Sequence, residues 1–127
     1  MSALKNATPE ASAQLRFRSR LSEVRSRLYS IPKSEFEKEK MLALIEEALK
    51  IASEKKALPE TRADALKLVA WSLRTRQFSE EELQKIEQGA SEAAKIAPTL
   101  EIMGALEEVR NSAQKSREKA GSQQTLF

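Results

Sequence analysis

The apolar residues of this chain recur at helical spacing in five successive segments, and this period limits the possible fold more than any other feature. The first segment shows it clearly, with intervals of four, three and four between Phe17, Leu21, Val24 and Leu28. Because residues three and four apart share one face of an α-helix, each segment predicts a helix with a single apolar side. We therefore expect helices throughout residues 9–119 and no strand.

Local start signals set the expected boundaries of the five helices. Ser34 and Ser79 are each followed three residues later by Glu, the pattern of a capping box. Pro9 and Pro59 suit the first position of a helix, and Thr99 follows the break at Pro98. The predicted helices are Thr8 to before Pro32, Ser34 to about Lys55, Pro59 to about Arg76, a fourth from Ser79 and a fifth from Thr99.

These segments predict an all-α fold, a compact bundle of four to five helices with a flexible C-terminal tail. Residues 1–7 are expected to form a flexible N-terminus, residues 8–119 the helical domain, and residues 120–127 the tail. Apolar residues cover more than half the circumference of the helix after Ser34. We expect that helix to be central and to contact several neighbours.

The composition disfavours an enzyme and a metal site. The chain has no His and no Cys, which removes the commonest general base, the commonest metal ligand and any thiolate site. The dense carboxylates at 46–47 and 80–82 are adjacent residues, and adjacent side chains on a helix diverge by about 100°. We expect no catalytic residue, no metal and no cofactor.

Two further absences in the sequence bear on location. No apolar run approaches the ~20 residues that span a bilayer. The N-terminus also lacks the apolar region of a signal peptide. We expect a cytoplasmic protein without a membrane contact.

An arginine cluster makes the first predicted helix a candidate nucleic-acid contact. Residues 1–34 carry seven Lys and Arg against two Glu, and the cluster consists of Arg16, Arg18, Arg20, Arg25 and Arg27. The neighbouring serines would suit phosphate. However, the arginines flank the apolar stripe, where their heads can meet Glu on adjacent helices. Structural pairing is the favoured interpretation, and DNA contact is the alternative.

Leu68 and Trp71 point away from the main apolar face of the third predicted helix. They are a possible partner face, with Trp71 as an aromatic anchor. Burial under another part of the chain is favoured, because large apolar residues are mostly buried.

The last five residues, Gln123-Gln124-Thr125-Leu126-Phe127, follow a break at Ala120, Gly121 and Ser122. A Gln anchor followed by an apolar pair suits capture as a short extended peptide. This peptide resembles the motif by which DNA polymerases and repair proteins dock on the bacterial sliding clamp, Gln-Leu-(Ser or Asp)-Leu-Phe. Gln123, Leu126 and Phe127 match it, Thr125 is small and polar as the family's middle position usually is, and Gln124 replaces the usual Leu.

The resemblance implies a clamp-binding protein of DNA replication or repair, either recruited to the clamp or inhibiting it by displacing polymerases. Gln123, Leu126 and Phe127 would be its clamp-binding residues. Two other function classes remain open from the residues alone. The Arg-rich helix would serve a nucleic-acid-binding or regulatory protein, and the face of Leu68 and Trp71 would serve a subunit of a hetero-oligomer.

Overall fold

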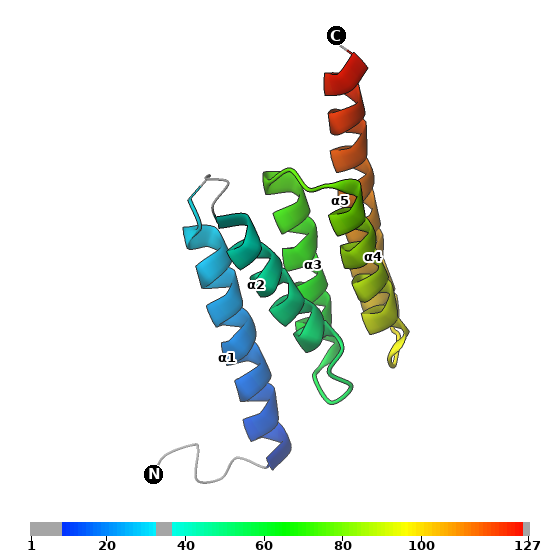
Figure 1. The fold of residues 1–127 in the computed structure, drawn as a ribbon. Helices are drawn as coiled ribbons and strands as arrows, with labels where there is room; N and C mark the ends of the chain where they lie inside the picture. The colour runs from blue at the N-terminus through cyan, green and yellow to red at the C-terminus, as the bar shows by residue number, and fades with distance from the viewer. Residues whose placement is uncertain (1–8, 33–36, 126–127) are drawn as a thin grey trace.

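The computed structural model describes residues 9–32 and 37–125, with side chains described as far as Lys119. Five helices lie side by side in it: α1 (Pro9–Ser30), α2 (Lys38–Ala52), α3 (Pro59–Thr75), α4 (Glu80–Lys95) and α5 (Leu100–Thr125) (Figure 1). No strand occurs in the described ranges. The predicted all-α bundle is therefore confirmed.

The local start signals that lie within the described residues act as predicted. Ser79 accepts a hydrogen bond from the backbone N–H of Glu82, and the Glu82 carboxylate accepts one from the backbone N–H of Ser79. Pro59 is the first residue of α3, and the Thr99 hydroxyl accepts from the Ile102 N–H at 3.2 Å. The predicted cap at Ser34 and the N-terminal segment 1–7 lie outside the described residues.

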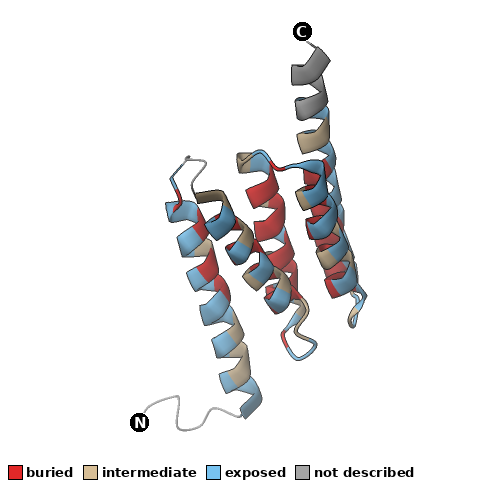
Figure 2. Ribbon diagram, in the orientation of Figure 1, coloured by how far each residue is buried: buried red, intermediate tan, exposed pale blue. Residues whose placement is uncertain are grey.

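The most deeply buried helix is α3, whereas the sequence favoured the helix after Ser34 as the central one. Figure 2 shows α3 buried along almost its whole length, while α2 keeps an exposed side. The small residues Ala63, Ala65, Ala70 and Ser72 allow α1, α2 and α5 to approach α3 from different sides. The α2 helix does contact several neighbours, namely α1, α3 and α4.

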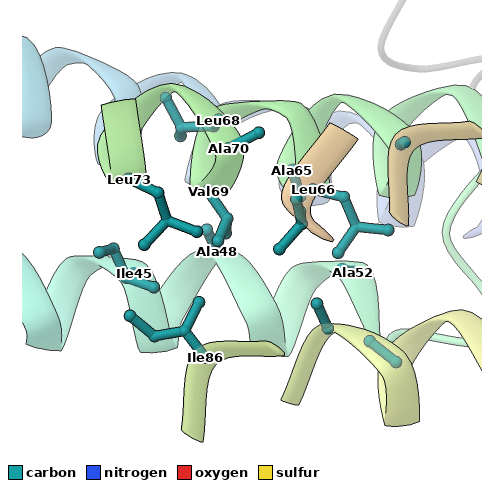
Figure 3. Packing of buried hydrophobic residues seen from close by; sticks show 14 of the residues in the cluster. Ile45, Ala48, Ala52, Ala65, Leu66, Leu68, Val69, Ala70, Leu73 and Ile86 are labelled. Carbon is teal, nitrogen blue, oxygen red and sulfur yellow. The ribbon is translucent and has the colours of Figure 1, made fainter. Parts of the chain in front are cut away.

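The core is aliphatic and alanine-rich, as the composition indicates. Figure 3 shows Leu66, Val69 and Leu73 of α3 facing α2, where Ala48 lies opposite them. Ile86 of α4 points toward α2 from the other side. Full burial of each large aliphatic side chain stabilises the fold by about 1.5–3 kcal/mol relative to exposure, so this layer is a main source of stability.

The last helix continues beyond the boundary predicted from the sequence. We expected the helical pattern to break at Ala120–Ser122, but α5 runs to Thr125 and extends past the ends of the other helices (Figure 1). Gly and Ser are poor helix formers, yet each costs at most about 1 kcal/mol in a helix, which does not force a break. The predicted tail 120–127 is thus helical as far as Thr125, and Leu126 and Phe127 lie outside the described residues.

Candidate interaction sites

The clamp-like peptide begins on the projecting part of α5. The last described side chain that ties α5 to another helix through an ion pair is Arg117. Its Nε donates to both carboxylate oxygens of Glu80 at 2.7 and 2.9 Å, and its Nη2 donates to Glu87. Gln123 lies six residues further on, within the helix. The body thus holds α5 against α4 up to Arg117 and lets the following residues project.

In the ion pairs of Arg117 with Glu80 and Glu87, each partner stabilises the charged form of the other. The hydrogen bond from Arg117 holds the pKa of the Glu80 carboxyl below its ordinary value. The same pairing, with Glu80 first and Glu87 second, raises the pKa of Arg117. Glu80 and Arg117 are therefore both ionised at neutral pH.

The five arginines of α1 divide into paired and unpaired groups. Arg27 donates to Glu23 on its own helix at 2.6 Å, and Arg20 lies 3.9 Å from Glu47 of α2. Within the described part of the chain, Arg16, Arg18 and Arg25 have no ion pair within 4.0 Å and no hydrogen bond. Among the described residues, internal pairing, the favoured interpretation, therefore accounts for two of the five arginines, and only the Arg20 pair joins two helices.

Leu68 is 3% exposed and packs in the core, so the structure offers no free face at this residue. Trp71 is half-buried, and its ring centroid lies 4.6 Å from that of Tyr29 at an interplanar angle of 58°. Burial was the favoured interpretation of this pair. The ring contact with Tyr29 of α1 is one that the sequence pattern did not identify.

Arg62 is a buried cation that sequence reasoning missed. It is 1% exposed, and its guanidinium donates to the carbonyl oxygens of four residues at two helix ends, Ala52, Ala93, Ile96 and Ala97. Burial lowers the pKa of Arg62, but a guanidinium stays charged at neutral pH. A sequence signal existed, because Arg62 stands in register with Leu66, Val69 and Leu73 on the apolar stripe of α3.

A second feature absent from the sequence analysis is a groove of about 1130 Å³ between α2 and α4. Its floor includes the partly buried apolar residues Leu42, Leu49 and Ile96, and its rim is rich in Glu. The apolar stripes of α2 and α4 are each visible in the sequence, but only the fold reveals that these two helices are neighbours. We call this feature the α2–α4 groove.

The described residues contain neither a metal-binding cluster nor a membrane-spanning helix. No three His, Cys, Asp or Glu side chains in this part of the protein converge on a position that could hold a metal ion. None of its helices is long and apolar enough to cross a membrane.

Comparison with known protein families, with curated protein sequences and with solved structures found no match to this chain.

Proposed function

We propose that the protein docks on a bacterial DNA sliding clamp through Gln123, Leu126 and Phe127 and acts in, or inhibits, DNA replication or repair. The observation that supports the proposal is the peptide itself, a Gln followed three residues later by a Leu-Phe pair. Leu126 and Phe127 would fill an apolar pocket on the clamp and supply most of the binding energy, as buried apolar anchors usually do. Gln123 would fix the register through its side-chain amide.

The position of the peptide favours this role. Gln123 lies beyond Arg117, the last described ion-pair anchor between α5 and the body, so an approaching clamp would meet little of the bundle. Docking as an extended peptide requires the last turn of α5 to unwind. That change is small, because Gly121 and Ser122 precede the motif and both favour non-helical conformations.

The helical bundle, which we call the body, would then determine what docking achieves. It could carry a contact to DNA or to another replication or repair protein, or it could block the clamp's peptide pocket and displace polymerases. Each of these alternatives begins with residues 123–127 occupying the clamp's peptide pocket.

Calorimetric titration of purified bacterial sliding clamp tests the proposal. We expect wild-type protein to bind with a Kd near the micromolar range, about −8 kcal/mol. A variant lacking Leu126 and Phe127 should lose binding and keep its helical circular dichroism, since these residues follow α5. Equal binding by both proteins, or binding by neither, would overturn the proposal.

Substitutions within the peptide provide matched controls. Gln124→Leu restores the residue usual in the clamp motif and should tighten binding, because it adds apolar contact. Gln124→Ala and Thr125→Ala should bind like wild type. A Gln123→Ala variant should bind more weakly, because it removes the amide that fixes the register.

A second candidate function is nucleic-acid binding by α1. It is favoured by the exposed Arg16 and Arg18, which have no ion pair with any other described residue. Phosphate contacts by these residues would make binding fall steeply with salt. Retention of the protein on duplex DNA at low salt, lost in Arg16→Ala/Arg18→Ala with folding intact, would support this role. No retention of the wild type at low salt would remove it.

A further inference from the structure

We propose that the α2–α4 groove binds an amphipathic helix of a partner protein, with an apolar stripe and basic residues on both flanks. This site is separate from the clamp-like peptide and from the α1 arginines. Together with clamp docking, it would make the protein an adaptor for two partners, although binding at the groove requires no clamp. The proposal does not depend on clamp docking.

The dimensions of the groove suit a short helix. Its α2 wall extends from Glu39 to Ser53, and its α4 wall extends from Glu82 to Ile96. At 1.5 Å per residue, each wall is about 21 Å long, which corresponds to about four helical turns. A partner helix of about 14 residues would span it.

The floor of the groove offers apolar surface that no described residue covers completely. Leu42 and Leu49 of α2 pack on the core from one side and remain partly exposed on the other. Gly89 of α4 lets Leu49 pack close against α4 in this floor, since a Cβ at this position would lie 3.0 Å from Leu49 Cδ1. An apolar stripe at positions i, i+3 or i+4, and i+7 of a docking helix could cover this floor.

The rim determines the charge of the partner. Six carboxylates line the groove against three cations, Arg20, Lys50 and Lys85. Glu81 and Glu82 have ion pairs, with Lys85 and Lys38 respectively. The other four, Glu39, Glu46, Glu54 and Glu92, have no ion pair with any residue that the structure describes.

This unbalanced negative charge selects a partner with Lys or Arg on the flanks of its apolar stripe. It also opposes an acidic helix or a nucleic acid at this site, because like charges across an interface are unfavourable. Charge complementarity therefore specifies one occupant, a basic amphipathic helix.

The probe is a synthetic 15-residue helical peptide with Leu along one face and Lys on both flanks, labelled with a fluorophore. A scrambled peptide of the same composition carries the same charge without the stripe. We expect the amphipathic peptide to bind the full chain at least about tenfold more tightly than the scrambled one, a difference of about 1.4 kcal/mol. Equal affinity for the two peptides would overturn the proposal.

Charge-reversal variants locate the binding site. Glu46→Lys/Glu92→Lys changes two exposed rim residues that lack ion pairs among the described residues. Glu108→Lys/Glu118→Lys makes the same charge change on exposed positions of α5 away from the groove. We expect about tenfold weaker peptide binding for the first variant and less than about twofold change for the second. Equal loss in both would mean non-specific charge attraction and would overturn the proposal.

A steric variant tests the same site without changing its charge. Ala43 is exposed and lines the groove, so Ala43→Trp should obstruct the site without disturbing the core. Unaltered peptide binding by this variant, with a wild-type circular dichroism spectrum, would overturn the proposal. A protein lacking residues 123–127 should bind the peptide like wild type, which separates this site from clamp docking.

A second copy of this chain is the alternative occupant. Sedimentation equilibrium of the wild type and of Glu46→Lys/Glu92→Lys distinguishes the two cases. We expect both proteins to be monomers. A wild-type dimer that the double variant dissociates would assign the groove to self-association and overturn the partner proposal.

Discussion

Arg62 Nη2 donates a hydrogen bond to the backbone carbonyl of Ala93 at 2.8 Å, joining the first turn of α3 to the last turn of α4. The same guanidinium reaches the end of α2, where Nε donates to the Ala52 carbonyl at 2.7 Å. Helix carboxyl ends carry free carbonyl groups and partial negative charge, and a cation there is favourable. One buried side chain therefore caps two helices, and no carboxylate among the described residues lies within 4.0 Å of it.

Replacement of Arg62 by Met should destabilise the protein strongly. Met fills much of the volume but leaves the buried carbonyl of Ala52 and the partly buried carbonyl of Ala97 without their Arg62 donor. An unsatisfied buried polar group costs about 1–3 kcal/mol, so we expect a loss of about 3 kcal/mol or more. Urea unfolding followed at 222 nm measures it. Arg74→Met, which removes an exposed arginine with one hydrogen bond to Ser112, is the control and should cost much less. A loss under about 1 kcal/mol for Arg62→Met would contradict this role.

The helical glycines Gly89 and Gly104 should respond differently to alanine. A Cβ on Gly104 would meet nothing within 4 Å, so Gly104→Ala should gain most of the helix-propensity difference, about 1 kcal/mol. A Cβ on Gly89 would lie 3.0 Å from Leu49 Cδ1 and force that side chain to shift. We therefore expect a smaller gain or a loss for Gly89→Ala, measured by urea unfolding. Equal stabilisation by the two substitutions would show that Leu49 moves without cost.

The helix starts could be predicted from sequence because capping is local. Ser79 and Glu82 are three residues apart, and their reciprocal hydrogen bonds depend on no other helix. The role of Arg62 could not be predicted, although its place in an apolar stripe was visible. Its carbonyl partners lie up to 35 residues away, and only the fold places the first turn of α3 beside the ends of α2 and α4.

The candidate sites also differ in this respect: local features were visible in the sequence, and features made by helix packing were not. The motif at Gln123 is read directly from the sequence, but the continuation of α5 to Thr125 was missed, since an exposed helix shows no apolar stripe to mark it. The α2–α4 groove combines two stripes about 40 residues apart, and nothing local indicates that they face each other. The Tyr29–Trp71 contact was missed for the same reason.

Because of the ion pair between Glu80 and Arg117, the free energy of unfolding should decrease as the pH becomes acidic. The pKa of Glu80 is below its ordinary value in the folded protein, chiefly because of the hydrogen bond from Arg117. Its stabilisation is therefore complete above the ordinary Glu pKa of about 4.3 and is lost as the pH falls through the lowered folded value. Urea midpoints measured from pH 7 to pH 3 should fall less for Arg117→Met than for wild type.

Lys119→Met is the control for that comparison, since Lys119 is exposed on the same helix and has no ion pair with the other described residues. It should retain the pH dependence of the wild type. Part of the dependence should also persist in Arg117→Met, because the pKa of Glu82 is lowered too. Partial burial raises that pKa, but the hydrogen bonds from Lys38 and from the Ser79 backbone outweigh it. An identical pH profile for Arg117→Met and wild type would exclude a role for the Glu80 pair.

The helical end of α5 leads to a prediction about clamp docking. If residues 123–127 bind as an extended peptide, the last turn of α5 must unwind first, and any substitution that strengthens the helix will oppose binding. Gly121→Ala strengthens a helix by about 0.8–1.0 kcal/mol, which should raise the Kd for the clamp about fivefold. Gly121→Pro disrupts the helix at the same position, so its Kd should equal or fall below that of wild type. Calorimetric titration against the clamp measures both Kd values. Helicity at 222 nm should rise in the first variant and fall in the second. Tighter binding by Gly121→Ala than by wild type would mean that the bound segment stays helical, in which case α5 itself, and not an unwound peptide, would be the surface that the clamp recognises.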